Sequence, residues 1–296
     1  MRLTAVLVNY NSGAEIARAL RSIADEVPDG AWEAIVIDNA SADGSDRIAA
    51  DFGAPVRVVS NAENRGFARG VNQGVAAARA DRVLVMNPDC RLVAGALDAL
   101  ESALDGDPAC ALVGPKILNP DGTPQGSARG DPDMLTGLFG RTALLRRLFP
   151  SLRVARRNVL VPDAGQGTVH VVDWLSGACF LAQTEALRSV GGLDERYFLY
   201  WEDSDLCRRL RAAGYVVKYV TSAFAVHRVG VSSRTARERS VRAFHDSAYL
   251  YYVTHVAPDR FDPRRLLARW LLRARCALWV RRLRARGDVP VPWEET

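Results

Sequence analysis

Four short apolar runs near the start of the chain constrain its fold most strongly. They occupy residues 4–8, 34–37, 56–59 and 83–86. Between them the apolar residues recur at helical spacing, as Ile16, Leu20 and Ile23 do after the first run. Strands that alternate with helices predict parallel pairing, so the expected fold class is α/β with an open sheet.

Each of these runs is closed by a cluster rich in Asn, Asp, Ser and Gly. The clusters occupy residues 9–13, 38–45, 61–66 and 87–89. The carboxyl ends of parallel strands meet at one edge of an open sheet, and ligands bind there. The same residue types also form ordinary turns, which is the alternative explanation. Asn or Asp at four successive strand ends favours a polar ligand.

The nucleotide-binding loops with the best-known sequence signatures are not present. No Gly-x-Gly-x-x-Gly follows the first run, and no Gly-x-x-x-x-Gly-Lys-Ser/Thr occurs in the chain. A dinucleotide fold and a P-loop are therefore not supported. Gly66, Gly70 and Gly74 recur every four residues, and a small helix face packed closely on the sheet explains Gly70 and Gly74.

A second acidic region follows an aromatic run at residues 197–201. Glu202, Asp203 and Asp205 precede or begin a helical pattern, so we expect these acids at a helix N-terminus. The helix dipole and its free N–H groups favour a charged carboxylate there. Such a carboxylate can serve as a general base for a hydroxyl group. Ordinary first-turn charges are the alternative.

Length and composition are consistent with one compact domain and an appendage. The chain has 296 residues and 48% hydrophobic content, enough for a large core. Its five cysteines form no Cys-x-x-Cys pair, which argues against zinc and a disulfide framework and fits a reducing compartment. Without a signal-peptide pattern or an apolar run of about 18 residues, a cytoplasmic location is expected, soluble or peripheral on the membrane.

The basic character of the chain is concentrated near its carboxyl end. Residues 264–286 hold nine arginines and no acid, whereas the whole chain has a net charge of +5. A body-wide nucleic-acid surface is therefore not expected. Seven apolar residues of this segment fall within an arc of about 140° on a helical wheel: Leu266, Leu267, Trp270, Leu271, Ala274, Ala277 and Leu278. Either the helix packs on the body with solvated arginines, or it lies on an anionic membrane.

Six motifs, in their order along residues 3 to 230, resemble those of family-2 glycosyltransferases. They are VNYNSG (8–13), VIDNASADGS (36–45), NRGFARGVNQG (64–74), NPD (87–89), WLSGA (174–178) and GGLDE (191–195). The NPD motif and YWED (200–203) resemble the rhamnosyltransferase branch of that family. Each motif alone is weak, but the ordered set is specific.

The resemblance implies a GT-A fold, a Rossmann-like and mainly parallel sheet flanked by helices, with a C-terminal helical extension. We expect residues 1–115 to form the nucleotide-sugar-binding half and 116–235 the acceptor-binding and catalytic half of one domain. Residues 236–296 would form the basic helical extension. Residues 119–169 are long for a connection and are expected to be a binding loop or lid, with a helix at 135–148.

The resemblance also implies roles for individual residues. Asp203 matches the catalytic base. Asp89 matches the acid that binds Mg²⁺ or Mn²⁺, and Asn87 replaces the first acid of the family's Asp-x-Asp motif. His227 lies where the family carries a histidine near the diphosphate, so it is expected to contact the metal or a phosphate. The expected donor contacts are Asn9, Tyr10, Asp38, Asn39, Asn64, Gly66, Asn72, Asn87 and Asp89. The expected acceptor contacts are Trp174, Ser176, Gly177 and Glu202, with Gln125, Ser127 and Arg129 as further candidates.

Some of these assignments have alternatives. Trp174 could stack on a sugar or belong to the core, and the polar residues 125–129 could be solvated. Residues 169–172 and 179–182 are expected to form a strand pair beside the acceptor.

The expected function is inverting transfer of a sugar from a nucleotide donor to a glycan or lipid-linked saccharide in cell-envelope polysaccharide biosynthesis. The expected donor is dTDP-L-rhamnose. The alternatives are another nucleotide sugar on the same fold, or a non-catalytic nucleotide-sugar-binding or membrane assembly subunit. The sequence leaves the oligomeric state open.

Overall fold

A central sheet forms the body of the protein. The structure, a computed structural model, describes residues 1–28, 30–130, 168–228 and 237–286. The strands of the central sheet are β1 (Leu3–Asn9), β2 (Trp32–Asp38), β3 (Val56–Ser60), β4 (Arg82–Met86), β5 (Cys90–Leu92), β6 (Cys110–Leu118), β8 (Val169–Val171), β10 (Cys179–Gln183) and β11 (Val216–His227). Two short strands, β7 (Ala128–Arg129) and β9 (Trp174–Leu175), pair with each other in a separate sheet. The helix expected at 135–148, and most of the expected lid, lie outside the described residues.

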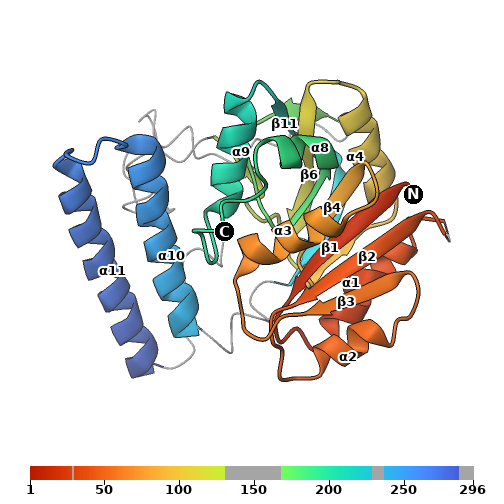
Figure 1. The fold of residues 1–296 in the computed structure, drawn as a ribbon, viewed down its shortest axis with the longest axis horizontal. Helices are drawn as coiled ribbons and strands as arrows, with labels where there is room; N and C mark the ends of the chain where they lie inside the picture. Colours follow the sequence, from red (N-terminus) through yellow and green to blue (C-terminus); the bar gives the residue numbers. More distant parts are fainter. Residues whose placement is uncertain (29, 131–167, 229–236, 287–296) are drawn as a thin grey trace.

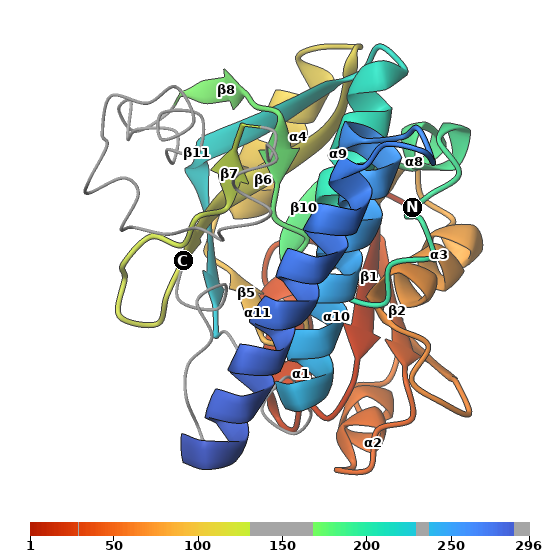
Figure 2. The same ribbon diagram turned by 90° about the vertical axis from the view of Figure 1, so that its left-hand side faces the viewer.

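The helices cover both faces of this sheet, and two of them lie side by side next to the body (Figures 1 and 2). They are α1 (Glu15–Ala24), α2 (Ser45–Ala50), α3 (Phe67–Ala77), α4 (Ala96–Asp105), α8 (Thr184–Ser189), α9 (Glu202–Ala212), α10 (Arg237–Tyr251), the π-helical turn η2 (Tyr252–Val256) and α11 (Arg264–Arg286). The pair beside the body is α10 and α11.

The sheet is parallel in its amino-terminal half and mixed beyond it. Its order is β3-β2-β1-β4-β10-β6-β11-β5, with β8 paired to β11. β1 pairs in parallel with both β2 and β4, and β2 pairs in parallel with β3. The predicted α/β class and the parallel arrangement of these four strands are confirmed. Their carboxyl ends therefore meet at one edge.

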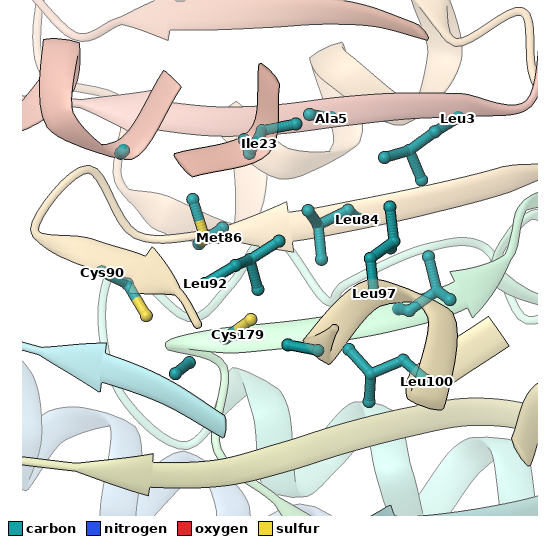
Figure 3. Packing of buried hydrophobic residues seen from close by; sticks show 14 of the residues in the cluster. Leu3, Ala5, Ile23, Leu84, Met86, Cys90, Leu92, Leu97, Leu100 and Cys179 are labelled. Atoms are coloured by element: carbon teal, nitrogen blue, oxygen red, sulfur yellow. The ribbon is translucent and has the colours of Figure 1, made fainter. Parts of the chain in front are cut away.

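The core lies on both faces of the sheet because side chains of a strand alternate between its faces. Leu3 and Leu7 of β1 pack against the α1 side, whereas Val6 and Val8 pack against the α3 side. Figure 3 shows part of the first cluster, with Ile23 of α1 beside Ala5 of β1. Burying each such side chain contributes roughly 1.5–3 kcal/mol.

Helix α3 approaches the sheet closely through two glycines. A Cβ atom on Gly70 would lie 2.8 Å from Val8 Cγ1, and one on Gly74 would lie 2.3 Å from Val6 Cγ1. At these distances either the helix or the valine side chain would have to shift. The close-packing explanation of these two glycines is confirmed.

The strand pair expected from residues 169–172 and 179–182 was wrong. β8 pairs with β11, whereas β10 lies between β4 and β6 and runs antiparallel to both. Such long-range pairing depends on the whole sheet and leaves little trace in the local pattern. One consequence is that the turn before β10 lies beside the carboxyl end of β4.

Helices α10 and α11 share a small apolar cluster of their own. Val241 of α10 packs with Val280 and Leu283 of α11, and Tyr200 from the body packs against the same cluster. Within the described residues, no helix is both long and apolar enough to cross a membrane.

Candidate active site

The carboxyl ends of β1 and β2 are joined by a buried polar network. Asn9 Nδ2 donates to Asp38 Oδ1 at 2.7 Å and to Ser45 Oγ at 2.9 Å. Asp38 Oδ2 accepts from the Ser41 backbone N–H at 3.0 Å. Asn9 and Asp38 are buried, whereas Tyr10 is partly exposed. The structure thus brings the predicted donor residues Asn9 and Asp38 together, and their contacts fix the loop that follows β2.

Asn39 and Asn64 connect this network to the start of α3. Asn39 Nδ2 donates to the Gly66 carbonyl at 3.1 Å, and Asn64 Oδ1 accepts from the Gly66 N–H at 3.0 Å. Gly66 has φ +87°, and a Cβ there would lie 2.5 Å from the Phe198 carbonyl oxygen. Glycine is therefore required for the aromatic run to approach α3.

Asn72 of α3 binds the main chain of the segment that precedes the aromatic run. Its Nδ2 donates to the Leu193 carbonyl at 2.8 Å, and its Oδ1 accepts from the Leu193 N–H at 2.8 Å. Both ends of the amide are thus used by the main chain. These two hydrogen bonds explain why an asparagine is present at this position without any contact to a nucleotide. Donor contact by Asn72 stays a prediction.

Asp89 and His227 meet where β11 ends beside β5. Antiparallel pairing sets His227 opposite Cys90, and His227 Nε2 lies 3.2 Å from Asp89 Oδ1. Burial lowers the pKa of His227, but the charge of Asp89 and its hydrogen bond outweigh this, so the pKa of His227 rises above its usual value. Asn87 Nδ2 lies 3.4 Å from the same His227 nitrogen.

Gln125 orients the imidazole of His227 through the ring nitrogen that does not face Asp89. His227 Nδ1 lies 3.0 Å from Gln125 Oε1, and Gln125 Nε2 donates to the His227 carbonyl at 2.8 Å. With Nδ1 as the donor to Gln125, Nε2 is the nitrogen that faces Asp89. The sequence suggested an acceptor contact for Gln125, and only the fold reveals its position beside His227.

The donor set of this pair fits an open site for a divalent cation. Among the described residues, no three His, Cys, Asp or Glu side chains cluster in a way that could enclose a metal ion. Asp89 and His227 would supply two ligands and leave other positions for water and phosphate oxygens. Mg²⁺ is usually held by one or two carboxylates together with a substrate phosphate, and Asp89 supplies one such carboxylate.

Asp203 lies in the first turn of α9, as predicted. Its Oδ2 accepts from the Gly177 N–H at 2.9 Å, and its Oδ1 accepts from the Ser204 N–H at 2.7 Å. The carbonyl of Ala178, the residue after Gly177, accepts from the Asn87 N–H at 2.9 Å. Residues 177 and 178 therefore connect Asp203 directly to the segment that carries Asp89.

The other predicted acceptor residues have less exposed positions. Trp174 packs in the core with the Arg129 guanidinium 5.7 Å from its ring centroid, which favours the core alternative over sugar stacking. Glu202 is only 5% exposed. Burial, and then the charge of Asp203, raise the pKa of Glu202 well above its usual value. The burial of Glu202 argues against the acceptor contact predicted for it, while Ser176 remains partly exposed.

The backbone is strained immediately before α9. Tyr200 has φ +67° and Trp201 has φ +70°, the left-handed region that bulky residues rarely adopt. Helix α10 stabilises this turn: the Trp201 ring lies 5.2 Å from that of Tyr251, and Ser247 Oγ donates to the Leu199 carbonyl at 2.9 Å. Strain of this kind is often found at functional sites.

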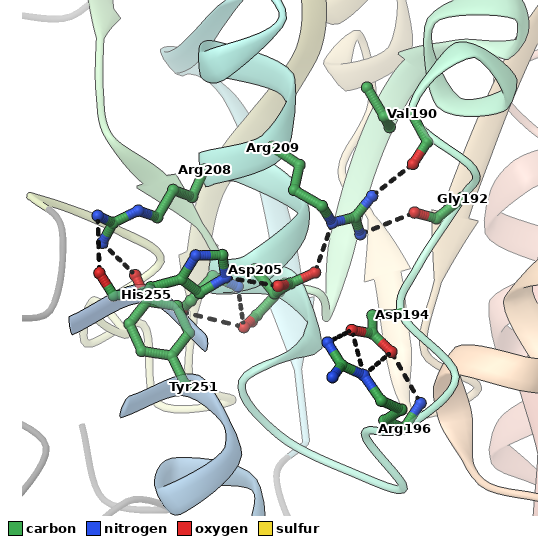
Figure 4. Close-up of polar contacts among 11 residues, drawn as sticks. Val190, Gly192, Asp194, Arg196, Asp205, Arg208, Arg209, Tyr251 and His255 are labelled. Carbon is green, nitrogen blue, oxygen red and sulfur yellow. Dashed lines mark hydrogen bonds and ion pairs between the residues drawn. The ribbon is translucent and has the colours of Figure 1, made fainter. Parts of the chain in front are cut away.

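A buried charge network fixes α9 itself (Figure 4). Asp205 Oδ2 accepts from Arg209 Nε at 2.7 Å, and Asp205 Oδ1 lies 2.7 Å from His255 Nε2. Arg209 also donates to the carbonyls of Val190 and Gly192. Of these contacts, only the i,i+4 spacing of Asp205 and Arg209 is visible in the sequence. The contact of His255 with Asp205 joins residues that are far apart in the chain, so no local pattern predicts it.

Comparison with known proteins identifies the family. The family model described as glycosyl transferase family 2 matches residues 4–160. The chain is 34% identical to the N-acetylglucosaminyl-diphospho-decaprenol L-rhamnosyltransferase of Mycobacterium tuberculosis over 93% of this chain and 91% of that protein. It is 25% identical to the low-salt glycan biosynthesis hexosyltransferase Agl10 of Haloferax volcanii, over 82% of this chain and 72% of that one.

Two solved structures support the fold at low sequence identity. GalNAc-T7, with UDP, GalNAc and Mn²⁺, has a TM-score of 0.60 at 15% identity, over 88% of this chain and 57% of that chain. The mannosyltransferase PcManGT from Pyrobaculum calidifontis, with GDP-Man and Mn²⁺, has a TM-score of 0.55 at 20% identity, over 98% of this chain and 76% of that chain.

The sheet and these neighbours show a GT-A fold, and the family model and the rhamnosyltransferase relative define the class as a glycosyltransferase, as the resemblance predicted. Within that class, the chain belongs to glycosyl transferase family 2 and resembles its rhamnosyltransferases.

Proposed function

We propose that this enzyme transfers L-rhamnose from dTDP-L-rhamnose, with inversion, to a saccharide carried on a polyprenyl diphosphate. The observation that carries the proposal is the connection of Asp203 to the Asp89 segment through residues 177 and 178 at one edge of the sheet. The similarity to a rhamnosyltransferase whose name specifies a diphospho-decaprenol acceptor supports the choice of substrates.

The proposed roles are those that the resemblance implies, and the positions of the side chains support them. Asp203 accepts the proton of the acceptor hydroxyl while that oxygen attacks the anomeric carbon from the face opposite the leaving diphosphate. Asp89 and His227 would hold a divalent cation, Mg²⁺ or Mn²⁺. When bound, this ion neutralises charge on the leaving group. The network of Asn9 and Asp38 supports the loops around the nucleotide.

Donor identity is tested by thermal shift with a panel of nucleotide sugars in the presence of Mn²⁺. A ligand that binds only the folded protein raises its stability according to its affinity. We expect dTDP-L-rhamnose to give the largest shift in melting temperature. A larger shift with a different nucleotide sugar would assign the donor to the alternative on the same fold.

The metal site is tested by Asp89→Asn, because the amide keeps the shape of the carboxylate and removes its charge. We expect Mn²⁺ affinity, measured by electron paramagnetic resonance with dTDP present, to fall by about tenfold or more. Asp98→Asn is the control, since Asp98 is exposed and paired with Arg2. Equal Mn²⁺ affinity of the wild type and Asp89→Asn would refute the assignment.

We further propose that α11 docks on an anionic membrane surface. The structure buries one side of this helix through Ala268, Leu272 and Val280. It leaves much of the predicted apolar arc exposed, with Leu266 at 73% and Trp270 at 67%. An exposed apolar stripe among arginines is typical of an interfacial helix.

This docking is tested by replacing exposed apolar side chains without changing charge. The triple variant Leu266→Ser, Trp270→Ser and Leu278→Ser should bind phosphatidylglycerol-containing vesicles at least about tenfold more weakly in sedimentation, because each side chain contributes roughly 1.5–3 kcal/mol when fully buried in the bilayer. Val171→Ser, at another exposed apolar side chain, should bind like the wild type. Binding of the triple variant as tight as that of the wild type would contradict docking of α11 on the membrane.

A further inference from the structure

A basic groove runs between α10 and α11, outside the candidate active site. It encloses about 700 Å³. The charged residues used in the argument below are Arg242, Arg269, Arg273, Arg281, Arg284 and Asp246. The two helices lie side by side next to the body in both views (Figures 1 and 2).

The arginines of this groove are not equally neutralised. Arg242 and Arg284 both pair with Glu238, at 2.8 Å and 2.7 Å. Within the described residues, Arg269, Arg273 and Arg281 have no ion-pair partner at that range. Asp246 is the single carboxylate among the lining residues. The groove therefore keeps a surplus of positive charge.

The chemistry of guanidinium groups points to a phosphate ligand. Arginine presents a planar fork of donors that matches phosphate oxygens and binds them with two hydrogen bonds. Arg269 and Arg273 are one turn apart on α11, so they project from the same side of the helix. A phosphate between them would meet both side chains.

The groove also borders the exposed apolar stripe of α11. Ala277 lines the groove and is exposed, and on a helix of 3.6 residues per turn it is close in angle to Leu266 and Trp270. A ligand that contacts both features must combine a phosphate with a hydrocarbon chain. A membrane lipid has this combination, whereas a free phosphate lacks the chain.

We propose that the groove between α10 and α11 binds the phosphate of a membrane lipid headgroup while the apolar stripe of α11 enters the bilayer. The site rests on the membrane docking proposed above and adds a specific polar contact to it. This contact would fix the orientation of the helix pair on the membrane, and thereby that of the attached catalytic body.

The test compares two charge-matched double variants on the same helix. Arg269→Gln with Arg273→Gln removes two groove arginines. Arg265→Gln with Arg282→Gln removes two arginines of α11 that do not line the groove. Binding is measured to phosphatidylcholine vesicles that contain either phosphatidylglycerol or an equal fraction of oleate, which is anionic but has no phosphate.

With phosphatidylglycerol, the groove variant should lose about tenfold more affinity than the control, because it loses charge-assisted hydrogen bonds as well as general attraction. With oleate, the two variants should lose equal affinity. The groove site would be overturned if the two double variants lost equal affinity for both vesicle types. It would also be overturned if the groove variant lost as much more affinity than the control with oleate as it does with phosphatidylglycerol. The apolar triple variant tests docking separately, so a failure of the docking proposal can be distinguished from a failure of the groove site alone.

A separate arm distinguishes a lipid from soluble phosphate. Inorganic diphosphate is titrated into the wild-type protein by calorimetry without vesicles and without metal. We expect much weaker binding than to phosphatidylglycerol vesicles. Binding as tight as that to the vesicles, and lost in the groove variant, would assign the site to a soluble phosphate and overturn the lipid proposal.

Discussion

Replacing Asp203 with asparagine is expected to lower the turnover of sugar transfer by about 10²–10⁴-fold, the usual contribution of a general base. The amide has nearly the shape of the carboxylate and can still accept from the Gly177 N–H, but it cannot take up a proton. Donor binding, measured by titration with the nucleotide sugar, should remain nearly intact because the base acts on the acceptor.

The neighbouring acid provides the comparison. Glu202→Gln changes a carboxyl group one residue away, and burial, followed by the charge of Asp203, raises the pKa of Glu202 well above its usual value. Burial therefore favours the neutral form of this side chain. The amide is close in shape to that neutral acid, so transfer should change little. Transfer by Asp203→Asn at the wild-type rate would end the assignment, as would a loss in Glu202→Gln as large as that in Asp203→Asn.

Replacing Asp205 with alanine is expected to cost about 3–5 kcal/mol of stability toward denaturant, the range for breaking a buried ion pair by removing one partner. Asp205 is 1% exposed, and its loss leaves the half-buried Arg209 without its carboxylate. His255 would lose its contact with the same side chain. Because this network fixes α9, transfer should also fall at temperatures at which the variant stays folded.

A surface pair with the same separation is the matched control. Arg82 Nη2 lies 2.7 Å from Asp105 Oδ2, the distance found between Arg209 and Asp205, but Asp105 is 53% exposed. Asp105→Ala should therefore cost at most about 1 kcal/mol. A similar loss in both variants would show that burial of the Asp205 network does not contribute to stability as we argue.

Local patterns predicted the amino-terminal half of the fold well. The apolar runs became β1 to β4, and the polar residues that end them lie along one edge, as the contact of Asn9 with Asp38 shows. The acids at the start of α9 were also predicted, because first-turn charges and helical spacing are both local. The resemblance to the family then supplied roles for Asp89, Asp203 and His227.

Features that depend on long-range packing were missed. The position of β10 between β4 and β6 is set by the whole sheet, and it brings residue 177 to Asp203. Gln125 and His227 are far apart in the chain, so their contact has no local spacing to reveal it. The apolar arc of α11 was visible, but only the structure shows that the opposite side faces α10.

The most direct test of the central claim is a crystal structure of the protein with dTDP and Mn²⁺, in which anomalous scattering locates the metal. We predict Mn²⁺ bound by the Asp89 carboxylate at roughly 2.0–2.2 Å, a usual range for small divalent ions on oxygen ligands. The diphosphate should lie in the space that Asp203 also faces. Metal and diphosphate bound away from Asp89, or separated from Asp203 by protein, would contradict the account.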